Sequence, residues 1–274
     1  MILISQYLNY MKSAHTSEQL EEYLKAMGIQ TWVRRSQTLV ADSGDNDVVE
    51  VDMEVELPAQ TGNETADGET VQSPSRVKPL PGEVITGDIS QFDWSQLKTA
   101  VETCTACPLH ETRTNTVFGI GDHNAQVMVI GEAPGADEDQ QGEPFVGRAG
   151  KLLNNMLMAI GYKREQVYIA NILKCRPPGN RDPDLEEISQ CEHFLKRQVE
   201  LIKPKVILAV GRIAAHNLMK VETPIGKMRG KLHYYDETPV VVTYHPAYLL
   251  RKPSEKAKAW DDLRFALKVI QGRN

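Results

Sequence analysis

The stretch 127–153, VMVIGEAPGADEDQQGEPFVGRAGKLL, decides the fold because it leads from a buried strand through a tight turn into the start of a helix. Residues 127–130 form the short, largely β-branched apolar run of a parallel strand that is covered on both faces. Gly131 and Gly135 then interrupt that run. Small residues at the carboxyl edge of an open α/β sheet let a ligand approach the main chain. We therefore expect a ligand site at this turn, with Phe145 projecting into it.

Two nucleotide-binding motifs are excluded here. A P-loop needs Ser or Thr after Gly-Lys, but Lys151 is followed by Leu152, and Phe145 stands where the first glycine is needed. The glycines at 119 and 121 precede the strand instead of following it, so a dinucleotide fingerprint fails as well. An ordinary strand-to-helix connection remains the alternative to a ligand site.

The charge of the chain divides it into two parts. Residues 1–90 hold 6 Lys and Arg against 15 Asp and Glu, whereas residues 91–274 hold 25 against 22, so the net charge of −6 comes from the front. A mildly basic body is compatible with nucleic-acid binding without requiring it. The N-terminus has no basic region ahead of a long apolar core, so we expect no signal peptide or membrane span and a cytoplasmic location.

Three segments are expected along the chain. Residues 1–36 include a short amphipathic helix over 16–27, which could serve as part of a docking peptide. Residues 37–90 form an acidic linker that we predict to be disordered, with an edge strand over 48–57 as the alternative. Residues 91–274 form the folded body.

The body alternates strand and helix patterns. The expected strands are 127–131, 167–171, 205–210 and 239–243. Because helical patterns separate them, they predict a parallel sheet with helices on both faces. The helix after Pro183 has acidic residues in its first turn, and Asp182 is the expected N-cap.

The four cysteines are Cys104, Cys107, Cys175 and Cys191. The first two form a C-x2-C pair, while fifteen residues separate the other two, the last of which falls inside an expected helix. In a cytosolic protein these are more often thiols or metal ligands than disulfides. Four thiolates suit either tetrahedral zinc or an iron-sulfur cluster, and four unrelated buried cysteines remain the alternative.

Four motifs resemble those of the family 4 uracil-DNA glycosylases, in the family's order: GEAPG (131–135), EPFVGRAG (143–150), NILKCRPPGNR (171–181) and HPAYLLR (245–251). The resemblance covers about residues 92–272. It implies an α/β, uracil-DNA glycosylase-like three-layer fold with a four-stranded parallel sheet. It also implies that the four cysteines hold a structural 4Fe-4S cluster, with zinc as the alternative.

The resemblance implies a monofunctional hydrolase that cleaves the N-glycosidic bond of deoxyuridine in DNA and so initiates base excision repair. Charge develops on the expelled uracil, and His245, which follows a strand ending at the same edge as GEAPG, would donate to uracil O2. The amide of Asn171 would pair with uracil O4 and N3–H, a pattern that cytosine inverts. Phe145 would stack on the flipped base, and the backbone of Glu132, Ala133 and Pro134 would line the pocket.

The water-orienting residue is not named by the motif. Ala133 stands where the classical uracil-DNA glycosylases carry an Asp. Glu132, Glu138, Asp139 and Asn180 are near enough in sequence, and the resemblance favours Glu132, Glu138 and Asn180 as catalytic residues. Because the sugar cation is highly reactive, orientation and charge can suffice without a strong base.

Phosphate contacts to single- or double-stranded DNA are expected from two loops, one with Arg251 and Lys252 and the other with Arg176 and Arg181. The segment 226–233 adds Lys227, Arg229 and Lys231. A related branch of the family becomes covalently trapped on uracil-DNA and has a longer basic, histidine-containing insertion near this segment, whereas this chain resembles the ordinary form. His233 keeps that alternative open, and a non-catalytic DNA or replisome adaptor is the other one.

Residues 24–35, LKAMGIQTWVRR, resemble the N-terminal peptide of the bacterial polymerase III psi subunit, which docks on the clamp loader. An aromatic residue beside charge suits a docking peptide. We therefore expect a clamp-loader contact through residues 20–36, with a helix packed on the body as the alternative. The protein is otherwise expected to be a monomer.

Overall fold

The computed structural model describes Lys25 and residues 88–272. The expectations for residues 1–36 and 37–90, including the docking peptide and the acidic linker, therefore lie almost wholly outside the described residues. No helix within the described residues is long and apolar enough to cross a membrane.

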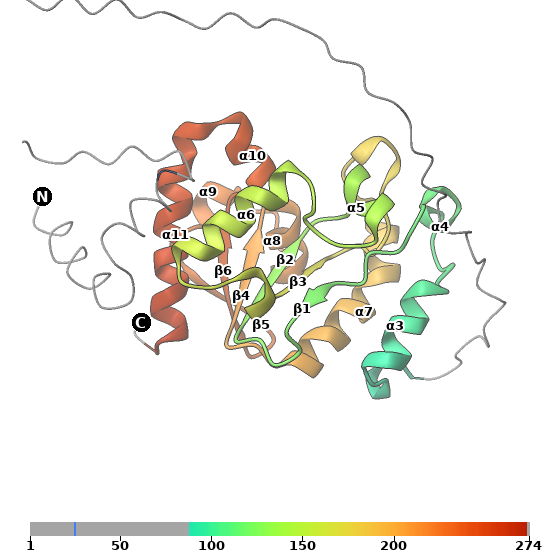
Figure 1. The fold of residues 1–274 in the computed structure, drawn as a ribbon. Coiled ribbons are helices and arrows are strands. Elements are labelled where there is room, and N and C mark those ends of the chain that lie inside the picture. The colour runs from blue at the N-terminus through green and yellow to red at the C-terminus, as the bar shows by residue number, and fades with distance from the viewer. Residues whose placement is uncertain (1–24, 26–87, 273–274) are drawn as a thin grey trace, which may run out of the picture. The chain divides into compact units, whose positions relative to one another are not determined.

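The core of the described body is a six-stranded mixed sheet with the order β1-β3-β2-β4-β6-β5 (Figure 1). Its strands are β1 (Ile120–Gly121), β2 (Val127–Gly131), β3 (Tyr168–Asn171), β4 (Val206–Val210), β5 (Leu232–Tyr235) and β6 (Thr238–Thr243). The four central strands are parallel, so the predicted parallel sheet is confirmed. The strand count of four was wrong, because β1 and β5 add antiparallel edges.

The two edge strands carry weak sequence signals. β1 is two residues long, too short to show an alternating pattern. β5, with the sequence LHYY, pairs with β6 across a tight turn in which Asp236 has a φ of 49°. That turn lacks the Asn-Gly or Asp-Gly pair that marks most two-residue hairpins, so the sequence did not reveal it.

Helices cover both faces of the sheet, which confirms the expected three-layer fold. One face packs against α7 (Leu185–Ile202) and α8 (Arg212–Met219). The other packs against α6 (Arg148–Ala159), α10 (Pro246–Arg251) and α11 (Lys256–Ile270). The remaining helices of four or more residues in the described part are α3 (Trp94–Glu102), α4 (Leu109–Thr112), α5 (Ala136–Gln141) and α9 (Ile225–Met228). Alternate residues of the central strands thus face two separate apolar layers.

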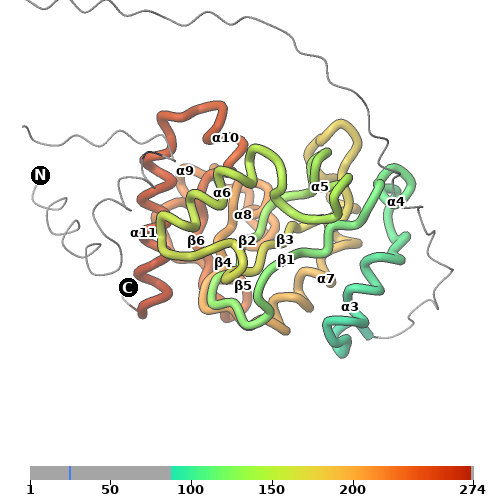
Figure 2. The backbone as a smooth tube through the Cα atoms, in the orientation of Figure 1, coloured from blue at the N-terminus to red at the C-terminus, as the bar shows by residue number. Residues whose placement is uncertain are grey.

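Helix α3 packs on α7 through a smaller apolar cluster (Figure 2). Leu97 and Val101 of α3 are fully buried there together with Phe118 and Phe194. A capping box at Asp93 and Gln96 starts the helix. This packing carries the segment that follows α3, with Cys104 and Cys107, to the flank of α7.

Two local expectations were wrong. The N-cap of α7 is Asp184, not Asp182, because residues 183 and 184 are still outside the helix and its first residue is Leu185. The carboxylate of Asp182 instead pairs with Arg212 at 2.8 Å. The HPAYLLR segment is not a loop, since Pro246 opens the short helix α10 and His245 is its N-cap.

Candidate active site and cysteine pocket

A pocket lies where β2, β3 and β6 end. Every residue predicted to act in catalysis or in base binding lines it: Glu132, Ala133, Pro134, Glu138, Phe145, Asn171, Asn180 and His245. Gly135, Ala149, Pro177, Arg181, Ala247 and Arg251 complete the lining. The carboxyl edge of the sheet thus brings together segments more than 110 residues apart in the chain, from Glu132 to His245.

Gly131 leaves the space in which Asn171 and Phe145 meet. Gly131 and Asn171 are directly paired in the β2–β3 register. A Cβ on Gly131 would lie 2.4 Å from Asn171 Oδ1 and 2.7 Å from Phe145 Cζ. Asn171 is only 2% exposed, and its Oδ1 has no hydrogen-bond partner among the described residues. A buried acceptor of this kind needs a partner, and a ligand in the pocket would supply one.

Phe145 is held in a left-handed backbone conformation with a φ of 54°. Its ring is buried, and its centroid lies 5.6 Å from that of His245, with 31° between the planes. Arg164 fixes the segment, since Nη2 donates to the carbonyl of Pro144 at 2.5 Å and Nη1 to that of Phe145 at 3.3 Å. Phe145 therefore presents a fixed aromatic face toward the pocket.

The ring of His245 is oriented by the start of α10. The Ala247 N–H donates to His245 Nδ1 at 3.1 Å, so the proton of the neutral ring sits on Nε2. Burial, with a smaller contribution from Arg251, lowers the pKa of His245 to about 4. At neutral pH the side chain is thus an uncharged Nε2–H donor.

Glu132 lines this pocket, and the pKa of its side-chain carboxyl is raised. Burial, with a smaller contribution from the nearby Asp182 and against the opposing effect of Arg212, raises the pKa of its carboxyl to about 7. Both protonation states of Glu132 are therefore populated near neutral pH. A carboxyl poised in this way suits a group that orients a nucleophilic water.

The carboxylates of Glu138 and Asp139 accept hydrogen bonds from backbone N–H groups. Glu138 Oε2 accepts from the Gly135 N–H at 3.1 Å, and Oε1 accepts from Val146 and Gly147 at 3.0 and 3.2 Å. This carboxylate joins the GEAPG turn to the Phe145 loop. Asp139 is buried and accepts from the Thr114 N–H at 2.9 Å, away from the pocket lining.

Asn180 lies at the mouth of the pocket in a left-handed conformation, with a φ of 55°. Its side chain is exposed, and its Oδ1 accepts from Arg176 Nε at 2.7 Å, a bond that does not involve the Nδ2 amide group. Asn180 can therefore donate to a water or a phosphate from this position.

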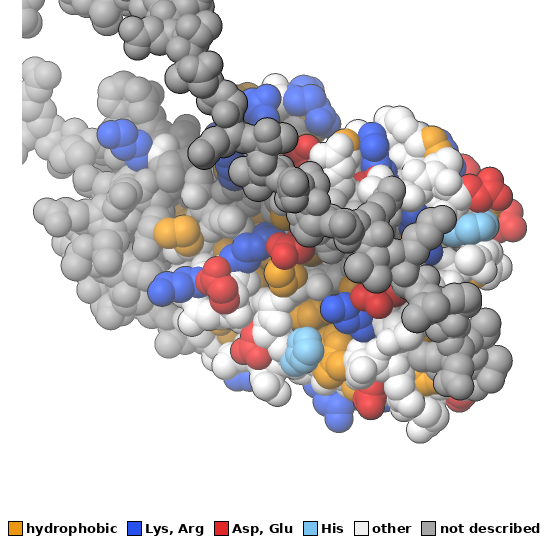
Figure 3. Space-filling model, turned by 45° about the vertical axis from the view of Figure 1, so that its right-hand side comes forward, with side chains coloured by type: hydrophobic (Ala, Val, Ile, Leu, Met, Phe, Trp, Pro, Cys, Tyr) orange, Lys and Arg blue, Asp and Glu red, His pale blue; other side chains and the backbone are white. Residues whose placement is uncertain are grey.

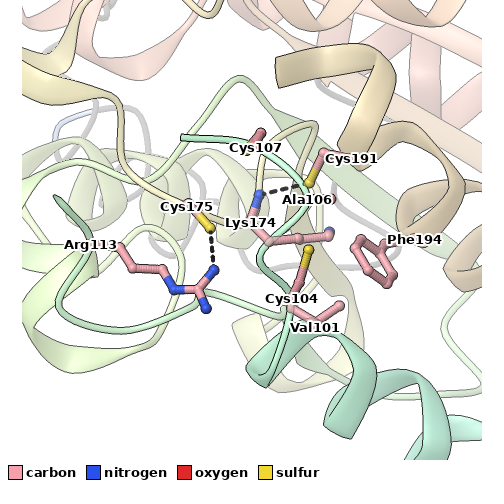
Figure 4. Close-up of a pocket in the computed structure, with 9 residues that line it drawn as sticks. All are labelled: Val101, Cys104, Ala106, Cys107, Arg113, Lys174, Cys175, Cys191 and Phe194. Atoms are coloured by element: carbon pink, nitrogen blue, oxygen red, sulfur yellow. Dashed lines mark hydrogen bonds between the residues drawn. The ribbon is translucent and has the colours of Figure 1, made fainter. Parts of the chain in front are cut away.

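The four cysteines line one small pocket beside α7, with Val101, Ala106, Arg113, Lys174 and Phe194 (Figure 4). Arg113 Nη1 donates to Cys175 Sγ at 3.1 Å, and the Lys174 amide N–H donates to Cys191 Sγ at 3.3 Å. Such donors stabilise thiolate sulfur, as they do around protein-bound clusters. Burial raises the pKa of the Cys107 and Cys175 thiols and raises that of Cys191 to about 12.

This donor set fits a sulfur-ligated group. Burial disfavours the free thiolate forms of Cys107, Cys175 and Cys191, and a bound metal would supply the positive charge that they need. Within residues 88–272, no three His, Cys, Asp or Glu side chains are arranged around a single metal ion. A four-iron cluster holds its thiolates farther apart than one tetrahedral ion does, so that finding concerns a single-ion site only.

A family model described as the uracil DNA glycosylase superfamily matches residues 118–264, more than half of the chain. The chain belongs to this superfamily. The match spans the pocket residues from Glu132 to His245 as well as Cys175 and Cys191, whereas Cys104 and Cys107 precede it.

Three relatives in the superfamily illustrate the similarity. The type-4 uracil-DNA glycosylase of Archaeoglobus fulgidus is 46% identical over 172 residues, which is 60% of this chain and 86% of the relative. That of Thermotoga maritima is 46% identical over 160 residues, 58% of this chain and 83% of the relative. The type-5 enzyme of Pyrobaculum aerophilum is 31% identical over 146 residues, 47% of this chain and 64% of the relative.

The basic residues expected to hold DNA in this superfamily member have different surroundings. Arg251 lines the pocket and is exposed, and Lys252 lies outside the pocket lining with its Nζ 5.8 Å from the centre of the Tyr248 ring. Arg181 lines the pocket, but its guanidinium pairs with buried Glu187 at 2.6 and 2.9 Å. Arg176 is bound to Asn180 and lies outside the lining.

The segment 226–233 contributes less to this surface than the sequence suggested. Arg229 pairs with Asp262 of α11 at 2.6 Å and is largely buried, while Lys227 and Lys231 are exposed. His233 Nε2 lies 2.8 Å from the carbonyl oxygen of Met228, outside the pocket lining. On the face shown in Figure 3, Lys and Arg side chains are interspersed with Asp and Glu.

The sequence analysis missed two residues that act on the pocket residues without lining the pocket. Arg164 stands 19 residues after Phe145, and Arg212 opens α8 beside Asp182 and Glu132. Arg212 follows Gly211 directly at the end of β4, which is the sheet edge where functional residues gather. That position is a signal that could have found it. Nothing in the local sequence marks Arg164.

Proposed function

We propose that this protein hydrolyses the N-glycosidic bond that joins uracil to deoxyribose in DNA and so initiates base excision repair. Membership of the superfamily supports this function, and the relatives named above are uracil-DNA glycosylases. The observation that carries it is the buried, unpartnered Asn171 Oδ1 in the same pocket as the neutral Nε2–H donor of His245.

Uracil enters the pocket after its nucleotide rotates out of the DNA stack. Phe145 stacks on the base. Asn171 Oδ1 accepts from uracil N3–H while Nδ2 donates to O4, which satisfies the acceptor left open in the protein. Cytosine presents an amine and a bare N3 at these positions, so binding it would leave two buried groups unpaired.

His245 stabilises the leaving base. As the glycosidic bond lengthens, negative charge collects on uracil, and a neutral Nε2–H aimed at O2 binds that charge more tightly than it binds the intact nucleotide. The Ala247 N–H holds Nδ1, so the ring is oriented before the substrate arrives. The imidazole needs no ionisation for this role.

Water attacks the sugar cation from the side of the pocket that carries acidic and amide groups. Glu132 is the residue we assign to orienting this water, with Asn180 as a second contact. Glu138 acts through its three backbone hydrogen bonds, which keep the turn at 131–135 against Phe145. We therefore place Glu138 among the positioning residues.

Phosphates on either side of the extruded nucleotide would be held by basic residues around the pocket. Arg251, which is exposed and lines the pocket, is the best placed of them, followed by the exposed Lys252 and the half-buried Arg176. Either single- or double-stranded DNA can supply these phosphates.

The 4Fe-4S cluster that the resemblance implies would be held by Cys104, Cys107, Cys175 and Cys191. When bound, it would tie together the segments that carry these four ligands and would take no part in the hydrolysis. Iron and sulfide analysis of anaerobically purified protein tests this assignment. About four of each per chain is the expected result, and one zinc without sulfide would support the zinc alternative.

The function is tested with a DNA oligonucleotide that carries a single uracil. Wild-type protein and His245→Ala are compared, and strand breakage is read before and after alkali. We expect breakage only after alkali, with the His245→Ala rate greatly reduced. Because no lysine of these motifs is placed as a Schiff-base nucleophile, the protein itself should not cut the strand.

Other outcomes distinguish the alternatives. Iron-loaded wild-type protein that releases no uracil would indicate a non-catalytic DNA or replisome adaptor. A denaturation-resistant protein–DNA adduct would indicate a covalent trap. His233 is hydrogen-bonded away from the pocket, so no observation favours the trap.

Residues 20–36 carry a separate proposal, which rests on their sequence alone. We propose that this segment docks on the replication clamp loader. We also propose that the enzyme is a cytoplasmic monomer. Deleting residues 1–36 should abolish clamp-loader binding while uracil release persists. Undiminished binding would disprove the docking proposal, and light scattering would test the monomer.

A further inference from the structure

Lys174 is the only buried lysine among the described residues, with a side chain that is 1% exposed. It stands three residues after Asn171 and one before Cys175. Burying a lysine costs free energy unless its ammonium group is hydrogen-bonded or paired with opposite charge, because the charge is taken out of water. Its contacts connect the two sites described above.

On the side of the base pocket, Lys174 holds the main chain of Asn171. Its Nζ donates to the Asn171 carbonyl at 3.0 Å and to Gln198 Oε1 at 2.7 Å. Gln198 is itself fixed, since Nε2 donates to the Phe118 carbonyl at 2.9 Å and to the Tyr168 hydroxyl at 3.1 Å. Both partners of Nζ are acceptors, which suits an ammonium group.

On the other side, Lys174 lines the cysteine pocket (Figure 4). Its amide N–H donates to Cys191 Sγ at 3.3 Å, and its carbonyl accepts from the Val117 N–H at 2.7 Å. The Lys174 ammonium also interacts electrostatically with Cys191 and Cys175, so it would offset part of the negative charge of these ligands as thiolates, in a region of low dielectric.

We propose that Lys174 is a positioning residue shared by the two sites: it fixes the Asn171 main chain for base recognition and is the buried counter-charge of the cysteine-bound group. This inference rests on the proposed uracil-glycosylase function and on the iron-sulfur assignment. On this inference, the affinity for the uracil base depends on the same ammonium group that offsets the charge of the thiolates.

The test uses anaerobically purified, iron-loaded protein and Lys174→Met, which keeps the unbranched side chain up to the ε position and removes the charged amine. Met fills most of the same volume but leaves the Asn171 carbonyl and Gln198 Oε1 without this donor, so thermal unfolding first verifies that the variant is folded. Two quantities are measured: the midpoint potential of the cluster by EPR-monitored reduction, and KM for a uracil oligonucleotide against the Kd of an abasic-site analogue.

We expect the Lys174→Met potential to be more negative than that of wild type, because a lost positive charge disfavours the reduced cluster. KM for the uracil oligonucleotide should rise roughly tenfold while the Kd of the abasic analogue, which has no base to read, stays constant. Arg113→Met, which contacts Cys175 and not Asn171, should shift the potential with a smaller rise in KM. Lys196→Met on the exposed side of α7 is the matched control and should change neither quantity.

An unchanged potential in Lys174→Met, or an unchanged KM, overturns the inference. If this variant does not load with iron, Gln198→Met decides the matter, because it removes an acceptor of Nζ and leaves Lys174 and the cysteines in place. An unchanged KM in that variant overturns the inference as well. Wild-type protein that releases no uracil would refute the proposed function instead, and wild-type protein without the cluster would refute the iron-sulfur assignment.

Discussion

At the scale of single residues, Gly131 sets the size of the base pocket. We predict that Gly131→Ala lowers kcat/KM for uracil release by at least about a hundredfold. The new Cβ takes the space between Asn171 and Phe145 and displaces the side-chain amide of Asn171, which we propose pairs with uracil. Single-turnover kinetics on a uracil oligonucleotide measure the loss. Thermal unfolding shows whether the fold is retained.

Gly226→Ala is the matched control for that substitution. Gly226 lies in α9, and a Cβ there meets no atom within 4 Å. Activity close to that of wild type is expected for this control. If Gly131→Ala released uracil as fast as Gly226→Ala does, the pocket would not be the site of base binding.

Glu132 gives the reaction a pH dependence whose sign follows from its environment. Burial raises the pKa of this carboxyl to about 7, and the ionised form is the one that would orient water in the role we propose. We therefore predict that kcat/KM falls as the pH drops below about 7. The neutral form of His245 persists down to about pH 4, so the acid limb near pH 7 belongs to Glu132.

Glu132→Gln separates the two groups. It should lower activity throughout and remove the limb near pH 7, leaving a profile that is flat from pH 5 to pH 8. A limb that remains near pH 7 in this variant would assign the ionisation to another group. Asp137→Asn, an exposed carboxylate on α5, is the control and should keep the wild-type profile.

The pocket residues that we propose to touch the base could be predicted from the sequence because each lies at the end of a strand or in a motif. Asn171 ends β3, His245 follows β6, and Phe145 lies in the loop that leads into α6. The residues that hold them could not. Arg164 and Lys174 act through hydrogen bonds to carbonyl groups, and any donor of suitable reach could do the same, so no local pattern marks them.

At the scale of elements, the four central strands were predictable because burial on both faces leaves continuous apolar runs. β1 and β5 were not, since an edge strand needs only a few backbone hydrogen bonds and no apolar run. The start of α7 was misplaced by two residues. Asp182 and Asp184 are equally good N-caps in sequence, and the choice depends on the Arg212 and Glu187 contacts.

The start of α7 also distinguishes two kinds of arginine. Arg181 pairs with Glu187, which is buried, and with Asp184, whereas Arg251 is exposed at the pocket. We predict that Arg181→Ala lowers the melting temperature, because it leaves a buried carboxylate unpaired. Arg251→Ala should leave the melting temperature unchanged and reduce the salt slope of DNA binding by about one.

Calorimetry and DNA binding at several salt concentrations check this pair of variants. Arg181→Lys is a useful companion, because it keeps the charge but cannot pair with both oxygens of Glu187. Equal melting temperatures for wild type and Arg181→Ala would show that the ion pair is dispensable. The residue would then return to the set of DNA contacts.

At the scale of the whole molecule, the cysteine pocket gathers segments that are far apart in the chain. Cys104 and Cys107 follow α3, Cys175 follows β3, and Cys191 is inside α7. A group bound to all four stabilises the folded state only, because the unfolded chain cannot assemble the site. We predict that removing the iron lowers the melting temperature by at least about 5 °C.

Anaerobic scanning calorimetry of loaded and chelator-treated protein measures this difference. Cys191→Ser should melt close to the treated wild type, and chelator should then have little further effect on it. Loaded and iron-free proteins that melt at the same temperature would contradict a structural role for the bound group.

The short segment between Asn171 and Cys175 has a consequence for how the gene can vary. Asn171 lines the pocket at the sheet edge and Cys175 lines the cysteine pocket, and the main chain between them hydrogen-bonds to residues 131 and 132 of the GEAPG turn. An inserted or deleted codon would move one end out of place whichever end kept its position. Insertions and deletions should therefore be tolerated in the exposed residues 221–224, between α8 and α9. Between residues 171 and 175 they should abolish activity.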